Sequence, residues 1–209
     1  MDSTERIIAA VSIAWAVIAL LFQLVSARRI GRKDYSVRAG SPIKGVIYNF
    51  TWAMLPSHKE TMRLHPYLFA VGVLMHIGVI IAIVEVLLLL AYPDLVFISP
   101  IVTGVTFGIP SLCALFLLLR RVFSVNLHAM SSIDDYLSIL ITLDFLLAAL
   151  AHGFGVTGSG VFMVHAAVLF FYLPFGKLRH AAFCPVARAK FGALLGYRGT
   201  YPAKSGAKE

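Results

Sequence analysis

Five apolar runs separated by shorter polar stretches dominate the hydrophobic pattern of the chain. A helix needs about 20 residues to cross the hydrocarbon core of a bilayer, and the five runs are long enough to be candidate spans. The fourth run is one of the two shortest and needs its flanking residues to span. The pattern predicts an all-α integral membrane protein folded as a five-helix bundle. The predicted spans are roughly Ile7–Val25, Pro66–Ala91, Ile101–Leu119, Tyr136–Ala151 and Val161–Gly176.

Composition agrees with a lipid environment. Hydrophobic residues make up 59% of the 209 residues and charged residues 13%, and the mean hydropathy is +0.86. A soluble domain of this size could not bury so much apolar surface, so the class of soluble globular proteins is excluded.

Lysine and arginine are divided very unequally between the two sides that five spans would create. Eight lie between residues 27 and 64, two open the loop after the third span, and seven follow from Lys177 onward. Only Arg6 falls on the other side. The positive-inside rule therefore predicts an outside N-terminus and a cytoplasmic C-terminus, in the cell inner (cytoplasmic) membrane. We expect a transmembrane domain over residues 1–180 and a cytoplasmic segment over residues 181–209, whose basic face meets anionic lipid or a protein partner rather than nucleic acid.

Four histidines stand in or beside the second and fifth spans. His65 and His76 are eleven residues apart, so at about 100° per residue they leave one helix face about 16 Å apart. His165 and His180 are fifteen residues apart, which keeps them on one broad face about 22 Å apart. If the two helices pack side by side, His76 faces His165 in the outer half of the membrane, and His65 faces His180 at the inner edge.

Each facing pair has the chemistry to hold one haem iron from both sides, because imidazole is a common axial ligand. Two axial ligands leave no open position for oxygen, which suits electron transfer. The alternative is that an intramembrane histidine only forms an interhelical hydrogen bond. His58, in the preceding loop, competes with His65 as the inner ligand.

Three stretches carry a family resemblance: "HPYLFAVGVLMHIG" in the second span, "SSIDDYLSILITL" at the fourth and "VHAAVLFFYLPFGKLRH" in the fifth. They resemble the respiratory nitrate reductase gamma-subunit family. That family includes the related cytochrome b subunits of heterodisulfide-reductase-like and sulfite-reduction-linked membrane complexes. The likeness covers most of residues 7–180, and "PFGKLRH" is its most specific part.

The resemblance implies a dihaem cytochrome b that exchanges electrons with the quinone pool. Its two haems b would be held by histidines that match the family's ligands in kind and order: His65, His76, His165 and His180. Menaquinone is the expected quinone. Cys113 and Cys184 form no cluster motif, so a cytoplasmic iron–sulfur subunit must carry electrons onward. The chain is then the quinol-oxidising or quinone-reducing subunit of a respiratory oxidoreductase complex.

Acidic residues inside spans are costly and usually face an interior, a partner or a water path. Quinol oxidation releases protons, and the candidate acceptors near the outer haem are Glu85, Asp144 and His152. Nine residues turn a helix by 900°, so Glu85 points half a turn away from His76. A purely structural role is the alternative for each of the three.

Two further groups of residues, three basic residues and two glycines, allow both a functional and a structural interpretation. Arg63, Lys177 and Arg179, at the inner ends of the second and fifth spans, would pair with haem propionates or only anchor the helices at the interface. Gly72 and Gly78 would let a macrocycle or a neighbouring helix approach.

The segment "SSIDDY" predicts a helix start. Ser131 or Ser132 is the expected N-cap, and Asp134 and Asp135 suit the first turn.

Two rival functions come from other classes. A transporter with histidines along a proton or metal path would have broken helices and a polar cavity, whereas only Pro110 and Pro174 interrupt the spans. A monohaem or haem-free anchor for a peripheral enzyme is the second rival.

Overall fold

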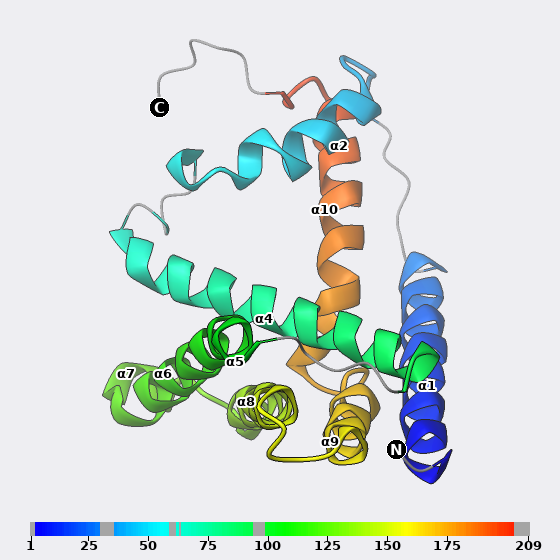
Figure 1. Cartoon of the computed structure of the whole chain (residues 1–209). Coiled ribbons are helices and arrows are strands. Elements are labelled where there is room, and N and C mark those ends of the chain that lie inside the picture. The colour runs from blue at the N-terminus through cyan, green and yellow to red at the C-terminus, as the bar shows by residue number, and fades with distance from the viewer. Residues whose placement is uncertain (1–2, 30–35, 59–61, 63, 94–98, 203–209) are drawn as a thin grey trace. The chain divides into compact units, whose positions relative to one another are not determined.

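The computed structural model of the chain describes residues 3–29, 36–58, 62, 64–93 and 99–202 (Figure 1). Within these ranges the chain is helical and contains no strand, which confirms the all-α prediction. The helices are α1 (Ser3–Arg29), α2 (Pro42–Phe50), η1 (Trp52–Met54), η2 (Pro56–His58), α4 (Pro66–Ala91), α5 (Pro100–Thr103), η3 (Gly104–Gly108), α6 (Ile109–Phe123), α7 (Val125–Ala129), α8 (Ile133–Gly153), α9 (Ser159–Tyr172), η4 (Lys177–Arg179) and α10 (His180–Tyr197).

Four helical segments of the described chain are long and apolar enough to cross a membrane. They are α1, α4, the run of α5, η3 and α6 from Pro100 to Phe123, and α8. These segments correspond to the first four predicted spans. The helices of the chain therefore have the length and composition of a multi-pass membrane protein.

The predicted fifth span is interrupted. α9 ends at Tyr172, and the next helical turn begins only at Lys177. Pro174 lies in the break, where it has no N–H to continue the helix and disfavours a helical conformation at the residue before it. A side chain at Gly176 would collide with Tyr172. Helix α9 thus covers the predicted span over residues 161–176 only as far as Tyr172, and there is a fifth span only if α9 is counted together with the helical residues Lys177–Tyr197 across the break.

The chain divides into two compact units. The first contains residues 1–21 and 67–179, and the second contains residues 22–66 and 180–209. The segment predicted to be a separate cytoplasmic tail from residue 181 thus shares its unit with the segment between α1 and α4.

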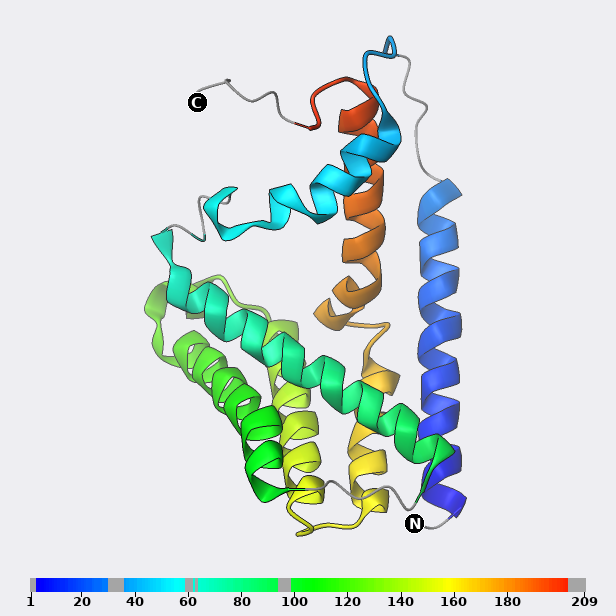
Figure 2. The same cartoon turned by 45° about the horizontal axis from the view of Figure 1, so that its top comes forward.

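Helices α6, α8 and α9 lie side by side in the first unit (Figure 2). Their core is aromatic: Phe145 of α8 stacks on Phe162 of α9 with ring centroids 5.6 Å apart. Gly78 of α4 is buried, and a side chain there would collide with Pro110 of α6. Close helix packing therefore explains Gly78, whereas a side chain at Gly72 would meet nothing within 4 Å.

The start of α8 is held by a capping box, and the N-cap predicted at Ser131 or Ser132 is confirmed. Ser132 is the N-cap, and Asp135 closes the box from the first turn. The buried carboxylate of Asp135 also accepts from Arg121 at 2.8 Å and from Lys177 at 2.5 Å. This one side chain joins the ends of α6 and η4 to α8.

Replacing Asp135 by alanine should lower the free energy of unfolding by about 2 kcal/mol, since it removes a cap and two ion pairs whose basic partners are partly exposed. Unfolding in mixed detergent micelles measures this loss. Arg120→Ala is the control for the loss of an exposed charge at the same end of α6, and an equal loss in both variants would contradict the role of Asp135.

Helices α2 and α10 pack closely in the second unit. Gly45 of α2 is buried against Gly192 and Gly196 of α10, and a side chain at any of the three would collide with backbone of the other helix. Asn49 Nδ2 donates to the carbonyl oxygen of Arg188 at 2.6 Å, and Arg188 Nη2 donates to Asn49 Oδ1 at 3.1 Å. Backbone contact between glycines thus ties together residues far apart in sequence.

Replacing Gly192 by leucine should push α2 away from α10, because the new side chain would collide with the backbone of α2. This separation would also break the Asn49–Arg188 hydrogen bonds. We expect a loss of about 3 kcal/mol, typical of overpacking, and faster proteolysis within residues 36–58. Gly158→Ala is the control, since a side chain there meets nothing within 4 Å. Unchanged proteolysis of the Gly192 variant would contradict the packing.

Candidate functional site

His165 and Asp144 form a pair across α9 and α8. His165 Nδ1 lies 2.7 Å from Asp144 Oδ2, and the two side chains are 36% and 47% exposed. A carboxylate can only accept, so this contact holds the imidazole in the tautomer that donates from Nδ1 and has its lone pair on Nε2. Metal-ligating histidines commonly donate their second ring nitrogen to a carboxylate in this way.

His76 is oriented in a similar manner from α4. Its Nδ1 lies 2.6 Å from the carbonyl oxygen of Gly72, one turn earlier. The carbonyl also accepts, so the lone pair of this ring is again on Nε2. The ring is exposed, and the open space at Gly72 leaves the helix face beside it accessible.

The face of α4 that packs into the core is not the face of His76. Ala82, Val86 and Leu89 belong to the core cluster, and Glu85 is buried beside them. His76 points to the opposite side, as the half-turn between it and Glu85 requires. The structure thus buries the other face of α4 and leaves His76 exposed and His165 partly exposed. The facing of His76 and His165 stays a prediction.

Glu85 and His152 come together inside the first unit. Glu85 Oε1 lies 3.7 Å from His152 Nε2, and Glu85 is 2% exposed. The His152 ring stacks on Phe162 with centroids 5.6 Å apart. Within the described residues, neither oxygen of Glu85 nor His152 Nδ1 has a hydrogen-bond partner. A buried carboxyl with spare acceptor capacity beside an imidazole is suited to holding a proton.

Asp144 therefore does not belong to the same contact as the other two proton-acceptor candidates, Glu85 and His152. It contacts His165, whereas Glu85 contacts His152. Intramembrane acids usually pair with another polar group. That rule could have suggested the Asp144–His165 pair from the sequence.

The inner histidines lie at helix boundaries. His65 immediately precedes α4 and His180 opens α10, and both are exposed. The predicted common face of His165 and His180 assumed an unbroken helix, and the break after Tyr172 removes that relation. His58, the competitor of His65, accepts or donates a hydrogen bond with Ser57 at 3.1 Å and packs on Trp52.

The cations proposed for haem propionates have different environments. Lys177 Nζ contacts Asp135 at 2.5 Å, so its charge already has a carboxylate partner. Arg179 is exposed at the end of η4. Arg63 lies outside the described residues.

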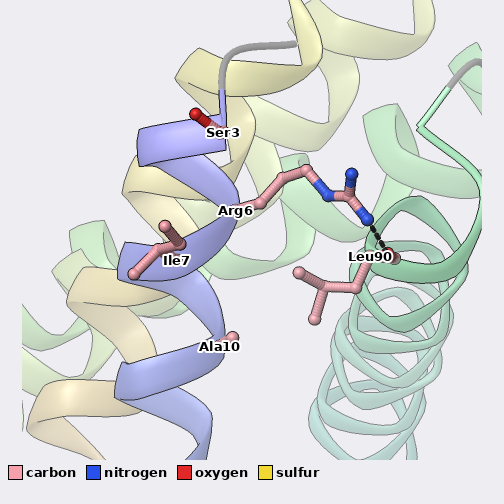
Figure 3. A pocket seen from close by; sticks show the side chains of 5 residues that line it. All are labelled: Ser3, Arg6, Ile7, Ala10 and Leu90. Carbon is pink, nitrogen blue, oxygen red and sulfur yellow. Dashed lines mark hydrogen bonds between the residues drawn. The ribbon is translucent and has the colours of Figure 1, made fainter.

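A small open pocket of about 380 Å³ lies between α1 and the end of α4. Its lining includes Ser3, Ile7 and Ala10 of α1 (Figure 3). Arg6 Nη2 donates to the carbonyl oxygen of Leu90 at 2.6 Å. This bond satisfies one of the carbonyl groups that a helix end leaves without a partner. The sequence indicated Arg6 only as a lone cation on its side of the membrane.

No group of three or more histidine, cysteine, aspartate or glutamate side chains suited to a metal ion occurs within the described part of the chain. A haem iron requires only two axial side chains, since the macrocycle supplies its other four ligands. Comparisons with protein-family models, curated proteins and solved structures give no match to this chain.

Proposed function

We propose that the chain is a membrane cytochrome b subunit that passes electrons between the quinone pool and a cytoplasmic iron–sulfur subunit. The observation that carries the proposal is the orientation of His165 by Asp144 at 2.7 Å. The same contact links α9 to α8, and it leaves the Nε2 lone pair of the ring available to a ligand. The resemblance to the nitrate reductase gamma-subunit family supports the same function.

The residues fit haem in donor chemistry. His165 and His76 both present Nε2 as the ligand atom, because Nδ1 of each meets an acceptor. In the proposal these two histidines hold the outer haem, and His65 and His180 hold the inner one. Bound haem would supply one-electron transfer, while the chain supplies ligation and a low-dielectric setting.

Glu85 and His152 are the proposed proton acceptors for quinol. Both are held in the first unit, and Glu85 has two buried acceptor oxygens. Glu85 and His152 would take up the protons of an oxidised quinol and release them on the side of the membrane nearer to the pair. Asp144 instead acts on His165 as a positioning residue.

The visible spectrum of purified membranes tests the proposal. A dithionite-reduced α band of the b type, with two haems for each chain, is the expected result. One haem for each chain would replace the dihaem assignment by the monohaem alternative. A spectrum without the band would overturn the cytochrome and leave the haem-free anchor or the transporter.

Replacing Asp144 by asparagine should keep both haems but raise the midpoint potential of the outer one. The asparagine no longer offers His165 a negatively charged acceptor, so the imidazole becomes a poorer donor to ferric iron. A redox titration followed at the α band measures the change. Thr142→Val, on the same helix, is the control, and an unchanged potential would contradict the positioning role of Asp144.

A further inference from the structure

Helix α2 carries a stripe of exposed apolar side chains opposite its buried glycine face. Ile43, Ile47 and Phe50 are 72%, 58% and 42% exposed. At about 100° per residue these three lie within an arc of about 60°. Gly45 and Asn49, which are buried against α10, lie on the opposite side. Ile43 and Ile47 therefore lie apart from the α2–α10 contact, whereas the Phe50 ring, at the edge of the stripe, also has the Arg188 guanidinium 6.0 Å from its centroid.

The apolar surface continues beyond the helix. Trp52, Met54 and Leu55 follow within five residues of Phe50, and all three are exposed. A contiguous apolar surface of this kind is unfavourable in water and marks a site of contact with lipid or protein. Tryptophan is enriched where a membrane meets water, because its ring is apolar while its N–H is polar.

The charges beside the stripe are all basic. Between residues 36 and 58 the sequence contains Arg38 and Lys44 and no aspartate or glutamate. Both cations are exposed, and Lys44 lies about 100° around the helix from Ile43, at the flank of the stripe. A helix with an apolar face, a basic flank and an aromatic residue at its end matches the pattern of helices that lie in the headgroup region of anionic membranes.

The chain length keeps this segment close to the bilayer. Twelve residues separate Arg29, the end of α1, from Pro42, the start of α2. They reach at most about 43 Å even when fully extended. α4, the next candidate span, begins at Pro66. The segment is thus tied to a membrane-spanning helix on each side.

We propose that α2 lies along the membrane surface, with Ile43, Ile47 and Phe50 at the boundary of the acyl chains. Arg38 and Lys44 contact phosphates of anionic lipids, and Trp52 lies at headgroup depth. The occupant of the stripe is lipid. This surface anchor is independent of haem and quinone.

The two tryptophans of the chain, Trp15 and Trp52, allow a direct test in nanodiscs. Trp15→Phe leaves Trp52 as the only reporter, and Trp52→Phe leaves Trp15, in the middle of α1. Lipids brominated near the headgroup should quench Trp52 more than lipids brominated near the chain ends. Trp15 should show the reverse order. Quenching of Trp52 should increase when phosphatidylglycerol replaces phosphatidylcholine.

A second variant separates lipid contact from loss of folding. In the Trp15→Phe background, Ile47→Glu should reduce quenching of Trp52 and shift its emission to longer wavelength. Thr200→Glu adds the same charge away from the stripe and should change neither. If neither brominated lipid quenches Trp52 fluorescence, and its emission shifts to shorter wavelength only when an iron–sulfur subunit is added, a protein occupies the stripe and the proposal fails. Equal quenching with neutral and anionic lipid would overturn the role of Arg38 and Lys44.

Discussion

Replacing His165 by alanine is expected to remove about half of the haem, because loss of one axial ligand already breaks a bis-histidine site. His76→Ala should remove the same half. The double variant should lose no more than either single variant, since both ligands serve one iron. Haem measured for each chain as the pyridine haemochrome gives the result.

The control for these losses is His128→Ala. His128 is exposed on α7 and hydrogen-bonded to Tyr136, so its loss should leave haem content unchanged. His65→Ala and His180→Ala should remove the other half. If His58→Ala removes haem while His65→Ala does not, the inner ligand is His58. Full haem in both His76→Ala and His165→Ala would refute the outer site.

Replacing Glu85 by glutamine should slow reduction of the haems by a menaquinol analogue about 100-fold, within the range typical of a lost proton acceptor. The amide keeps the size of the side chain but cannot take a proton. His152→Gln should slow the same step. Because the two groups are 3.7 Å apart, the double variant should be no slower than the slower single variant. Stopped-flow absorbance at the α band follows the rate.

Dithionite reduction separates this effect from loss of haem, since dithionite needs no proton acceptor and should reduce every variant fully. Glu5→Gln removes a carboxyl from α1 and should leave the rate unchanged. Unchanged rates and inhibitor affinity in both Glu85→Gln and His152→Gln, with haem retained, would place quinol oxidation elsewhere in the chain.

Features that depend only on residues close together along one helix could be predicted from the sequence. The N-cap at Ser132 followed from local hydrogen-bond chemistry. Glu85 and His76 were predicted to lie half a turn apart, and the structure has one buried and the other exposed. Which of the two faces is buried could not be predicted, because α4 is apolar all round and periodicity then gives no inward direction.

Contacts between helices were harder to predict. Asp144 and His165 are 21 residues apart on two helices, so their meeting depends on how α8 and α9 pack. The break after Tyr172 required weighing Pro174 against the apolar run that surrounds it. The α2–α10 contact had only small residues as its signal, and small residues are common wherever helices of a membrane protein approach closely.

The α2–α10 contact also imposes an order on biosynthesis. Asn49 and Arg188, which bond to one another, are separated by 139 positions. At about 5–20 residues per second, α2 waits on the order of ten seconds for its partner to leave the ribosome. During that interval Gly45 has no opposing helix, and α1, α4, α6 and α8 are all made before α10. The second unit can therefore form only after almost the whole chain has been synthesised, so a chain truncated before α10 leaves α2 without its packing partner.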